Sequence, residues 1–146
     1  MDSRDPAALG GDLAAALRGV LGPVTVEDLT RLSGGASRET WSFDAVGTGG
    51  SRSELVLRRD PPGRPSEPGA MSREARVIAA ARAAGLAVPE VLLSTAEPDL
   101  WGTAGLVMRR IAGETIARRI LRDAAYRQAR KVLVRQVGRA SCRERV

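Results

Sequence analysis

The sequence predicts an α+β fold in which a helix packs on a five-stranded antiparallel sheet. Three strand-like segments precede the first helix that could cover them, and two more follow it. The links between the first three strands are too short for the crossovers that parallel strands need, so the sheet should be antiparallel. The chain has 146 residues, of which 43% are hydrophobic and 27% charged, and it has room for a single modest core.

A helix is predicted near the start of the chain. Asp5 and Pro6 have the residue types of a helix N-cap and first helical position, and Gly22 with Pro23 ends the segment. Apolar residues recur between these signals at helical spacing and should form one face: Leu9, Leu13, Leu17 and Val20 or Leu21.

Five strands are predicted from apolar alternation and from the turn residues that bound them. Trp41, Phe43 and Ala45 occupy every second position, as in a half-buried strand. A glycine-containing turn over residues 33–38 should join the first two strands. The expected strands are Val26–Leu32, Trp41–Val46, Glu54–Arg58, Val91–Leu93 and Gly105–Met108.

The helix expected to cover the sheet runs from about Met71 to Ala84, with Gly85 as the left-handed residue just past its end. One stripe of this helix should face the core, and its members stand at i, i+3, i+4 and i+7: Glu74, Val77, Ile78 and Ala81. The stripe includes a carboxylate, whose desolvation requires a cationic partner.

Arg58 is the natural partner for that carboxylate. Residues two apart in a strand share a face, so Arg58 and Val56 point away from the layer that holds Leu57. Arg58 and Glu74 should then form an ion pair, the arrangement with which kinases hold the α and β phosphates of a nucleotide. The alternative is that Glu74 lies in solvent at the helix edge and Arg58 has no partner.

Two further helices are expected near the end of the chain. Thr115 should cap a short helix that ends at Leu121, and Asp123 should cap a longer one. The longer helix carries an apolar stripe for which we expect no covering partner, so that the stripe is exposed: Tyr126, Ala129, Val132, Leu133 and Val137.

Composition excludes several kinds of site. The chain has no histidine and one cysteine, Cys142, which excludes disulfide frameworks, the usual zinc sites and histidine-dependent catalysis. Neither the P-loop nor the Rossmann glycine pattern occurs. No apolar run is long enough to span a membrane and no signal peptide is recognisable, so a cytoplasmic protein without membrane contact is expected.

Positive charge is concentrated late in the chain. Residues 109–146 contain 12 basic and 3 acidic residues, a net charge of +9, whereas residues 1–108 have a net charge of −3. Solvated arginine faces explain this segment, and the alternative is a binding module for nucleic acid or an acidic partner. Nucleic acid is disfavoured because the four aromatic residues do not interleave with the basic clusters.

Five runs of sequence occur in a characteristic order: LSGGASRETW at 32–41, LVLRRDPPG at 55–63, REA at 73–75, AGLAVP at 84–89 and LVMRRIAGE at 106–114. Together they resemble the amino-terminal part of the aminoglycoside phosphotransferase family, and more narrowly the phosphotransferases related to those fused to acyl-CoA dehydrogenases. The resemblance extends to about Val137. It implies the nucleotide-binding lobe of a kinase-like fold, in a family that transfers the γ-phosphate of ATP to a small-molecule hydroxyl with Mg²⁺.

The resemblance also implies roles for individual residues. Arg58 takes the place of the family's strand lysine, with Glu74 as its helix partner, and Val56 lies against the adenine. The loop that covers the phosphates, through backbone amides and one hydroxyl, comprises Ser33, Gly34, Gly35, Ala36, Ser37 and Arg38.

The hinge that reads the adenine edge is, by the same resemblance, the backbone of Arg109, Arg110 and Ile111. The chain departs from the kinase pattern in two ways. Its phosphate loop lacks the full protein-kinase glycine pattern, and arginine at position 58 replaces a point charge by a planar fork. The geometry at the phosphates need not be the same as with lysine.

We expect four parts along the chain: an N-terminal helix over 1–22, the nucleotide-binding lobe over 23–112, the hinge and first helices of a second lobe over 113–137, and a tail over 138–146. The family's catalytic loop, of H-x-D-x-x-x-x-N type, and its Mg²⁺ ligands would lie beyond this chain, which should be inactive alone. The tail GRASCRERV resembles a translated sequencing adapter, so we expect a read-through artefact. The alternative is a genuine basic tail.

Overall fold

The computed structural model describes residues 5–32, 38–63, 67–95, 101–114 and 116–142, and the side chains of Val134 and of residues 136–142 are left out of the description. The chain divides into two compact units, Met1–Ile111 and Ala112–Val146, which are described separately below. Among the described residues, no helix is long and apolar enough to cross a membrane.

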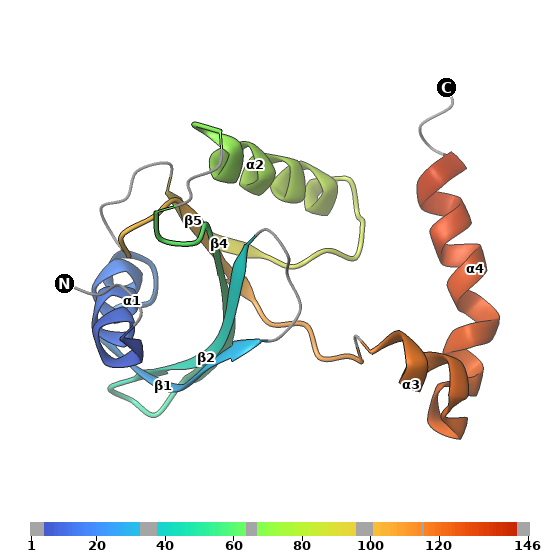
Figure 1. Cartoon of the computed structure of the whole chain (residues 1–146), viewed down its shortest axis with the longest axis horizontal. Helices are drawn as coiled ribbons and strands as arrows, with labels where there is room; N and C mark the ends of the chain where they lie inside the picture. Colours follow the sequence, from blue (N-terminus) through green and yellow to red (C-terminus); the bar gives the residue numbers. More distant parts are fainter. Residues whose placement is uncertain (1–4, 33–37, 64–66, 96–100, 115, 143–146) are drawn as a thin grey trace. The chain divides into compact units, whose positions relative to one another are not determined.

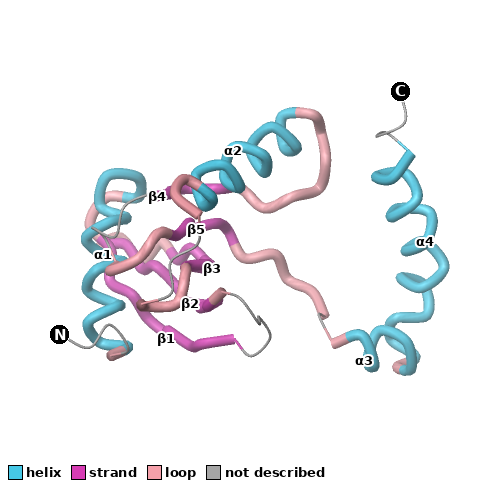
Figure 2. Tube along the Cα trace, turned by 45° about the horizontal axis from the view of Figure 1, so that its top comes forward, coloured by secondary structure: helices cyan, strands magenta, loops and turns pink. Residues whose placement is uncertain are grey.

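A five-stranded antiparallel sheet forms the centre of the first unit (Figures 1 and 2). The strands follow the order β1-β2-β3-β5-β4 across the sheet, and every neighbouring pair is antiparallel. This confirms the predicted α+β class and the antiparallel pairing. The strand bounds are Val24–Leu32 for β1, Glu39–Gly47 for β2, Arg52–Arg59 for β3, Val91–Thr95 for β4 and Gly105–Arg109 for β5.

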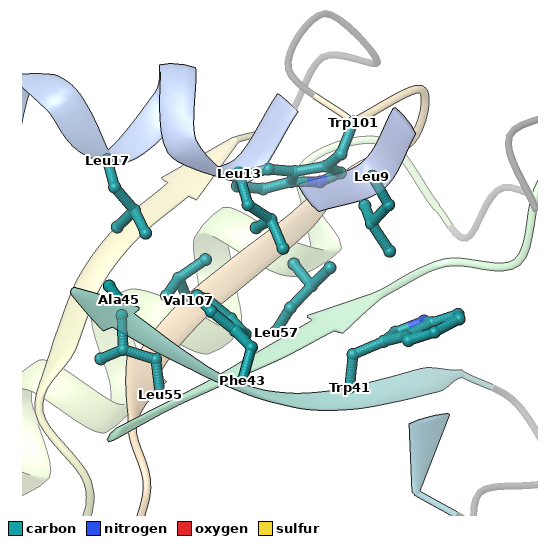
Figure 3. Close-up of a cluster of buried hydrophobic side chains, with 10 residues drawn as sticks. All are labelled: Leu9, Leu13, Leu17, Trp41, Phe43, Ala45, Leu55, Leu57, Trp101 and Val107. Carbon is teal, nitrogen blue, oxygen red and sulfur yellow. The ribbon is translucent and has the colours of Figure 1, made fainter. Parts of the chain in front are cut away.

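The helix α1, Pro6–Leu21, covers one face of the sheet. The Asp5 carboxylate accepts a hydrogen bond from the Ala7 N–H at 3.0 Å, which confirms the predicted N-cap. Figure 3 shows the leucines of α1 pointing toward the side chains of the sheet. Of the two alternatives for its last apolar position, Leu21 packs against the core and Val20 is exposed. The buried cluster contains Leu9, Leu13, Leu17, Trp41, Phe43, Ala45, Leu55, Leu57, Trp101 and Val107.

The helix α2, Ala70–Ala83, packs on the opposite face, over β4 and β5. Its buried residues are Met71 and Ala75, which contact Leu106. The predicted stripe through Glu74 and Val77 is therefore displaced, and Val77 is 64% exposed. Glu74 lies at the margin of the packed stripe, half-buried, because its charge is stabilised by arginines at the edge of the covered area.

Gly85 ends α2 as the sequence predicts. Its φ is +77°, its N–H donates to the Arg82 carbonyl at 2.9 Å, and the Leu86 N–H donates to the Ala81 carbonyl at 3.0 Å. These two bonds form a Schellman motif, which requires a left-handed residue at this position. Glycine adopts that conformation without the steric cost that a Cβ would bring.

A buried ion pair joins β2 to β3 on the α1 face. Arg59 and Glu39 are direct neighbours across the strands, and their Nε and Oε2 atoms lie 3.0 Å apart. Arg59 is 1% exposed and also donates to the Trp101 carbonyl at 3.1 Å. Its guanidinium lies 5.8 Å from the centre of the Trp41 ring. The sequence analysis did not foresee this pair, because two neighbouring arginines in a strand look alike.

The second unit consists of α3, Ala117–Arg122, the short 3-10 helix η1, Ala124–Tyr126, and α4, Arg127–Cys142. Both predicted caps are corrected. Residue 116 is the N-cap of α3, and Thr115, the predicted cap, lies outside the described residues. Asp123 precedes η1 and makes no side-chain capping bond. Arg130 instead donates to the Asp123 carbonyl at 2.8 Å, because a long cation reaches carbonyls that the short Asp side chain cannot serve.

The predicted apolar stripe of α4 is partly exposed. Ala129 and Leu133 are exposed, whereas Tyr126 and Val132 are half-buried. The side chain of Val137 is not among those described. The prediction of exposure is thus confirmed for two of the five stripe residues and wrong for two.

Replacing Glu39 by alanine should lower the free energy of unfolding by about 3–5 kcal/mol, because it removes a partner of a buried cation. The matched control is Glu90→Ala. Glu90 pairs with Arg109 at 3.0 Å, but both side chains are largely exposed, so the loss should stay below about 1 kcal/mol. Urea unfolding of both variants measures the difference, and equal losses would contradict the buried pair.

Candidate functional site

The face of the sheet that α2 partly covers is apolar on one half and polar on the other. Leu106 and Met108 of β5 lie in the half that packs around α2. Cross-strand register places residues of β2 and β3 beside them on the same face, because side chains alternate along each strand. The other half of the face therefore presents Thr40, Ser42, Asp44, Glu54, Val56 and Arg58.

The predicted ion pair between Arg58 and Glu74 is present. Arg58 Nη1 donates to Glu74 Oε1 at 2.6 Å and so links β3 to α2. The side chains are 38% and 23% exposed, which places the pair between a surface pair and a buried one. The alternative in which Glu74 lies in solvent without a partner is therefore wrong.

Glu74 also binds a second arginine. Arg38 Nη1 donates to Glu74 Oε2, and Arg38 Nε lies 3.4 Å from Asp60 Oδ1. Asp60 is buried directly after β3, where its N–H donates to the Ala104 carbonyl at 3.0 Å. The sequence analysis assigned Arg38 to the phosphate loop through its backbone and missed these side-chain contacts. A buried Asp two residues after Arg58 was the available signal.

Val56 lies where the sequence predicts, on the same face as Arg58 and next to Met108 in register. It is half-buried and lies directly across from Ser42 on the other side. The structure thus brings Val56, Arg58 and Glu74 together with Arg38. The five remaining loop residues of the prediction lie outside the described part of the chain: Ser33, Gly34, Gly35, Ala36 and Ser37.

The predicted hinge is partly committed to the sheet. The Arg109 N–H donates to the Glu90 carbonyl at 2.9 Å, and the Arg110 N–H donates to the Glu54 carbonyl at 2.9 Å. These two amides are therefore not free to read a ligand, because the chain continues sheet-like pairing past the end of β5. Among the described residues, no backbone group accepts from the Ile111 N–H. The expectation that all three backbones face a base is corrected to the carbonyls and this one amide.

The side chain of Arg110 folds back over the polar half of the face. Its Nη1 donates to Ser42 Oγ at 2.9 Å, and its Nη2 lies 2.8 Å from Glu54 Oε1 and 3.4 Å from Asp44 Oδ1. Arg52 donates to Asp44 Oδ2 from the other side at 2.8 Å, and this hydrogen bond raises the pKa of the Arg52 guanidinium. The hinge is thereby tied to β2 and β3, a contact that sequence reasoning did not find.

Among the described residues, no group of three or more acidic, cysteine or histidine side chains converges in a way that could hold a metal ion. The acidic side chains of the site are instead paired with arginines, as Glu74 and Asp60 are. The residues present therefore do not fit the Mg²⁺ that the resemblance implies.

Comparison with known proteins decides the family. The sequence matches the phosphotransferase enzyme family over residues 28–143. The chain belongs to this family. Such a match covers the sheet, α2 and both predicted strand and helix members of the ion pair.

A solved structure agrees with this family assignment at the level of the fold. The chain resembles a crystal structure from Ralstonia eutropha JMP134 that is assigned as an aminoglycoside phosphotransferase, with a TM-score of 0.52 and 24% sequence identity. The similarity covers 73% of this chain and 29% of that protein, so the present chain spans under a third of its length. No curated protein matches the chain. The α+β, kinase-like fold expected for the phosphotransferase family is thus confirmed.

Glu74→Gln should lower the free energy of unfolding by about 1–3 kcal/mol, because two guanidiniums lose their shared anion while solvent still reaches both. Arg58→Met and the double variant complete a double-mutant cycle. Urea unfolding of the four proteins should give a coupling energy clearly above zero. Strict additivity would mean that the contact contributes nothing.

Proposed function

We propose that this chain is the nucleotide-binding lobe of an ATP-dependent phosphotransferase whose acceptor is a hydroxyl group of a small molecule. The observation that carries the proposal is the ion pair between Arg58 on β3 and Glu74 on α2, beside an uncovered half of the sheet. In kinases a strand cation held by a helix glutamate binds the nucleotide phosphates. Family membership supports the same reaction class.

The pairing leaves Arg58 able to bind a phosphate. A guanidinium has five N–H donors, and among the described residues only Glu74 accepts from this one. Glu74 fixes one side of the planar fork, while the partly exposed remainder points its donors to a ligand. An arginine can therefore replace the lysine of the kinase pattern and keep its helix partner.

An apolar surface lies one row away from this cation. Val56 and Met108 face each other across β3 and β5, and residues two apart on a strand are separated by about 7 Å. A nucleotide could place its base on that surface and its phosphates at Arg58. The Ile111 N–H and the hinge carbonyls are the groups left to read the base edge, and the loop 33–38 would cover the phosphates.

The chain's own residues bind and orient in this proposal. The reaction class moves a phosphoryl group from ATP to an acceptor oxygen and leaves ADP, and most of the protein's contribution is positioning and charge neutralisation. Arg58 supplies the neutralising charge. No step is assigned to Mg²⁺, because the described acidic residues are already paired with arginines.

The arginine-rich segment gives less support to the alternative, a module for nucleic acid or an acidic partner. Several of its arginines bind acceptors of the chain itself, which reduces the charge they present. Arg119 lies 3.2 Å from Glu114, and Arg130 donates to the carbonyls of Ile120 and Asp123 at 2.8 Å. Retention on heparin above physiological salt would favour that alternative.

Arg58→Ala should weaken ATP binding at least about tenfold, since it removes a charge-assisted contact to phosphate. The control is Arg73→Ala on an exposed part of α2, where the guanidinium lies 3.5 Å from Glu67 and should not affect the nucleotide. Isothermal titration calorimetry with ATP measures both. Equal affinities for wild type and Arg58→Ala would overturn the proposed site, as would a wild-type chain that binds no nucleotide.

The purified 146-residue chain should bind ATP without turning it over. It contains no histidine and therefore no H-x-D-x-x-x-x-N element, and phosphoryl transfer requires an oriented acceptor as well as a nucleotide site. Release of ADP, followed by a coupled assay with candidate hydroxyl acceptors, tests this. Turnover that disappears in Arg58→Ala would show that the chain is catalytically complete.

A further inference from the structure

The carboxylate of Glu74 is shared between two arginines from different elements. Oε1 accepts from Arg58 on β3, and Oε2 accepts from Arg38, which lies just before β2. Each oxygen thus fixes one guanidinium, and the two cations are held on either side of a single anion. The kinase pattern, with one cation and one glutamate, accounts for Arg58 and leaves Arg38 unexplained.

Asp60 fixes Arg38 from a second direction. Its Oδ1 lies 3.4 Å from Arg38 Nε, and the aspartate is buried at the end of β3. Two charged contacts on different atoms restrict the plane of a guanidinium as well as its position. This double restraint keeps Arg38 where its remaining donors have a defined direction.

Arg38 retains donors for a ligand. Its Nη1 and Nε serve Glu74 and Asp60, and among the described residues no acceptor is found for its Nη2. The side chain is 20% exposed, so the guanidinium lies at the surface of the site and not within the core. Nη2 carries two N–H groups, which matches the oxygens of a phosphate group.

We propose that Arg38 is a second phosphate ligand, that it acts together with Arg58 on the polyphosphate chain of a nucleotide, and that Asp60 is its positioning residue. This inference rests on the proposed nucleotide site. Two guanidiniums from different elements can bind different phosphates of one chain, whereas a single phosphate cannot engage both fully. The site should therefore discriminate by the number of phosphates.

A purely structural role for Arg38 makes a different prediction. If Arg38 only held Glu74 in place, its loss would disturb Arg58 and the neighbouring apolar surface together, and ligands with and without phosphates would weaken in parallel. A phosphate ligand should affect ATP strongly, AMP less and adenosine hardly at all.

The test measures dissociation constants of ATP, AMP and adenosine by calorimetry for the wild-type chain, Arg38→Ala, Arg38→Lys and the control Arg73→Ala. Arg38→Ala should weaken ATP about tenfold or more and leave adenosine within about twofold. Arg38→Lys should recover part of the ATP affinity, since it restores the charge without the fork. Asp60→Asn should weaken ATP by a smaller factor than Arg38→Ala.

Stabilisation against heat by inorganic triphosphate provides a second measurement that needs no base contact. It should be present in wild type and reduced in Arg38→Ala and Arg38→Lys, so that a variant with lower stability still reports on phosphate binding. Unchanged ATP affinity in Arg38→Ala, or a parallel loss of adenosine, would overturn the inference while leaving the nucleotide site in place. Failure of the wild-type chain to bind any nucleotide would overturn both.

Discussion

The alternation of β3 constrains most of this structure. Leu55 and Leu57 must enter the core beneath α1, so Val56 and Arg58 necessarily lie on the opposite face. That face is covered by α2 only over β4 and β5. A cation at position 58 therefore lies at the edge of a helix and next to an uncovered area, where it can meet both a helix carboxylate and a ligand.

Arg58 and Arg59 show how strongly this alternation acts. They are adjacent and chemically identical, yet one is partly exposed at the candidate site and the other is buried beside Glu39 and two tryptophans. The buried pair anchors the ends of β2 and β3 on the core side. Because Glu39 follows Arg38 directly, the same two strand ends hold a structural ion pair on one face and the paired arginines of the site on the other.

Charge at the site is arranged as restraint more than as excess. Glu74 and Asp60 neutralise Arg38 and Arg58 in the absence of a ligand, and each contact also fixes the direction of a guanidinium. Arg110 repeats the principle at the hinge, where Ser42, Asp44 and Glu54 hold its side chain across the sheet. Side chains fixed in this way lose little further freedom when a ligand binds, which favours affinity.

The sequence by itself determined the features that depend on local periodicity. The leucine face of α1, the alternation of β2, the antiparallel pairing, the turn at Gly85 and the partnership of Arg58 with Glu74 all follow from spacing within one element or between two adjacent elements. The family resemblance added roles for the loop and the hinge. Those loop positions lie outside the described residues, and part of the hinge is engaged by the sheet.

Tertiary structure alone decided the features that depend on strand register and on helix rotation. Glu39 and Arg59 are 20 residues apart, and Arg38 and Glu74 are 36 apart, so no local pattern joins them. The rotation of α2 depends on how Met71 and Ala75 fit the apolar residues of β5, which displaces the expected stripe. Long-range register and packing are set by the whole folded chain, because each side chain's partner is fixed only when the strands have paired and the helix has docked.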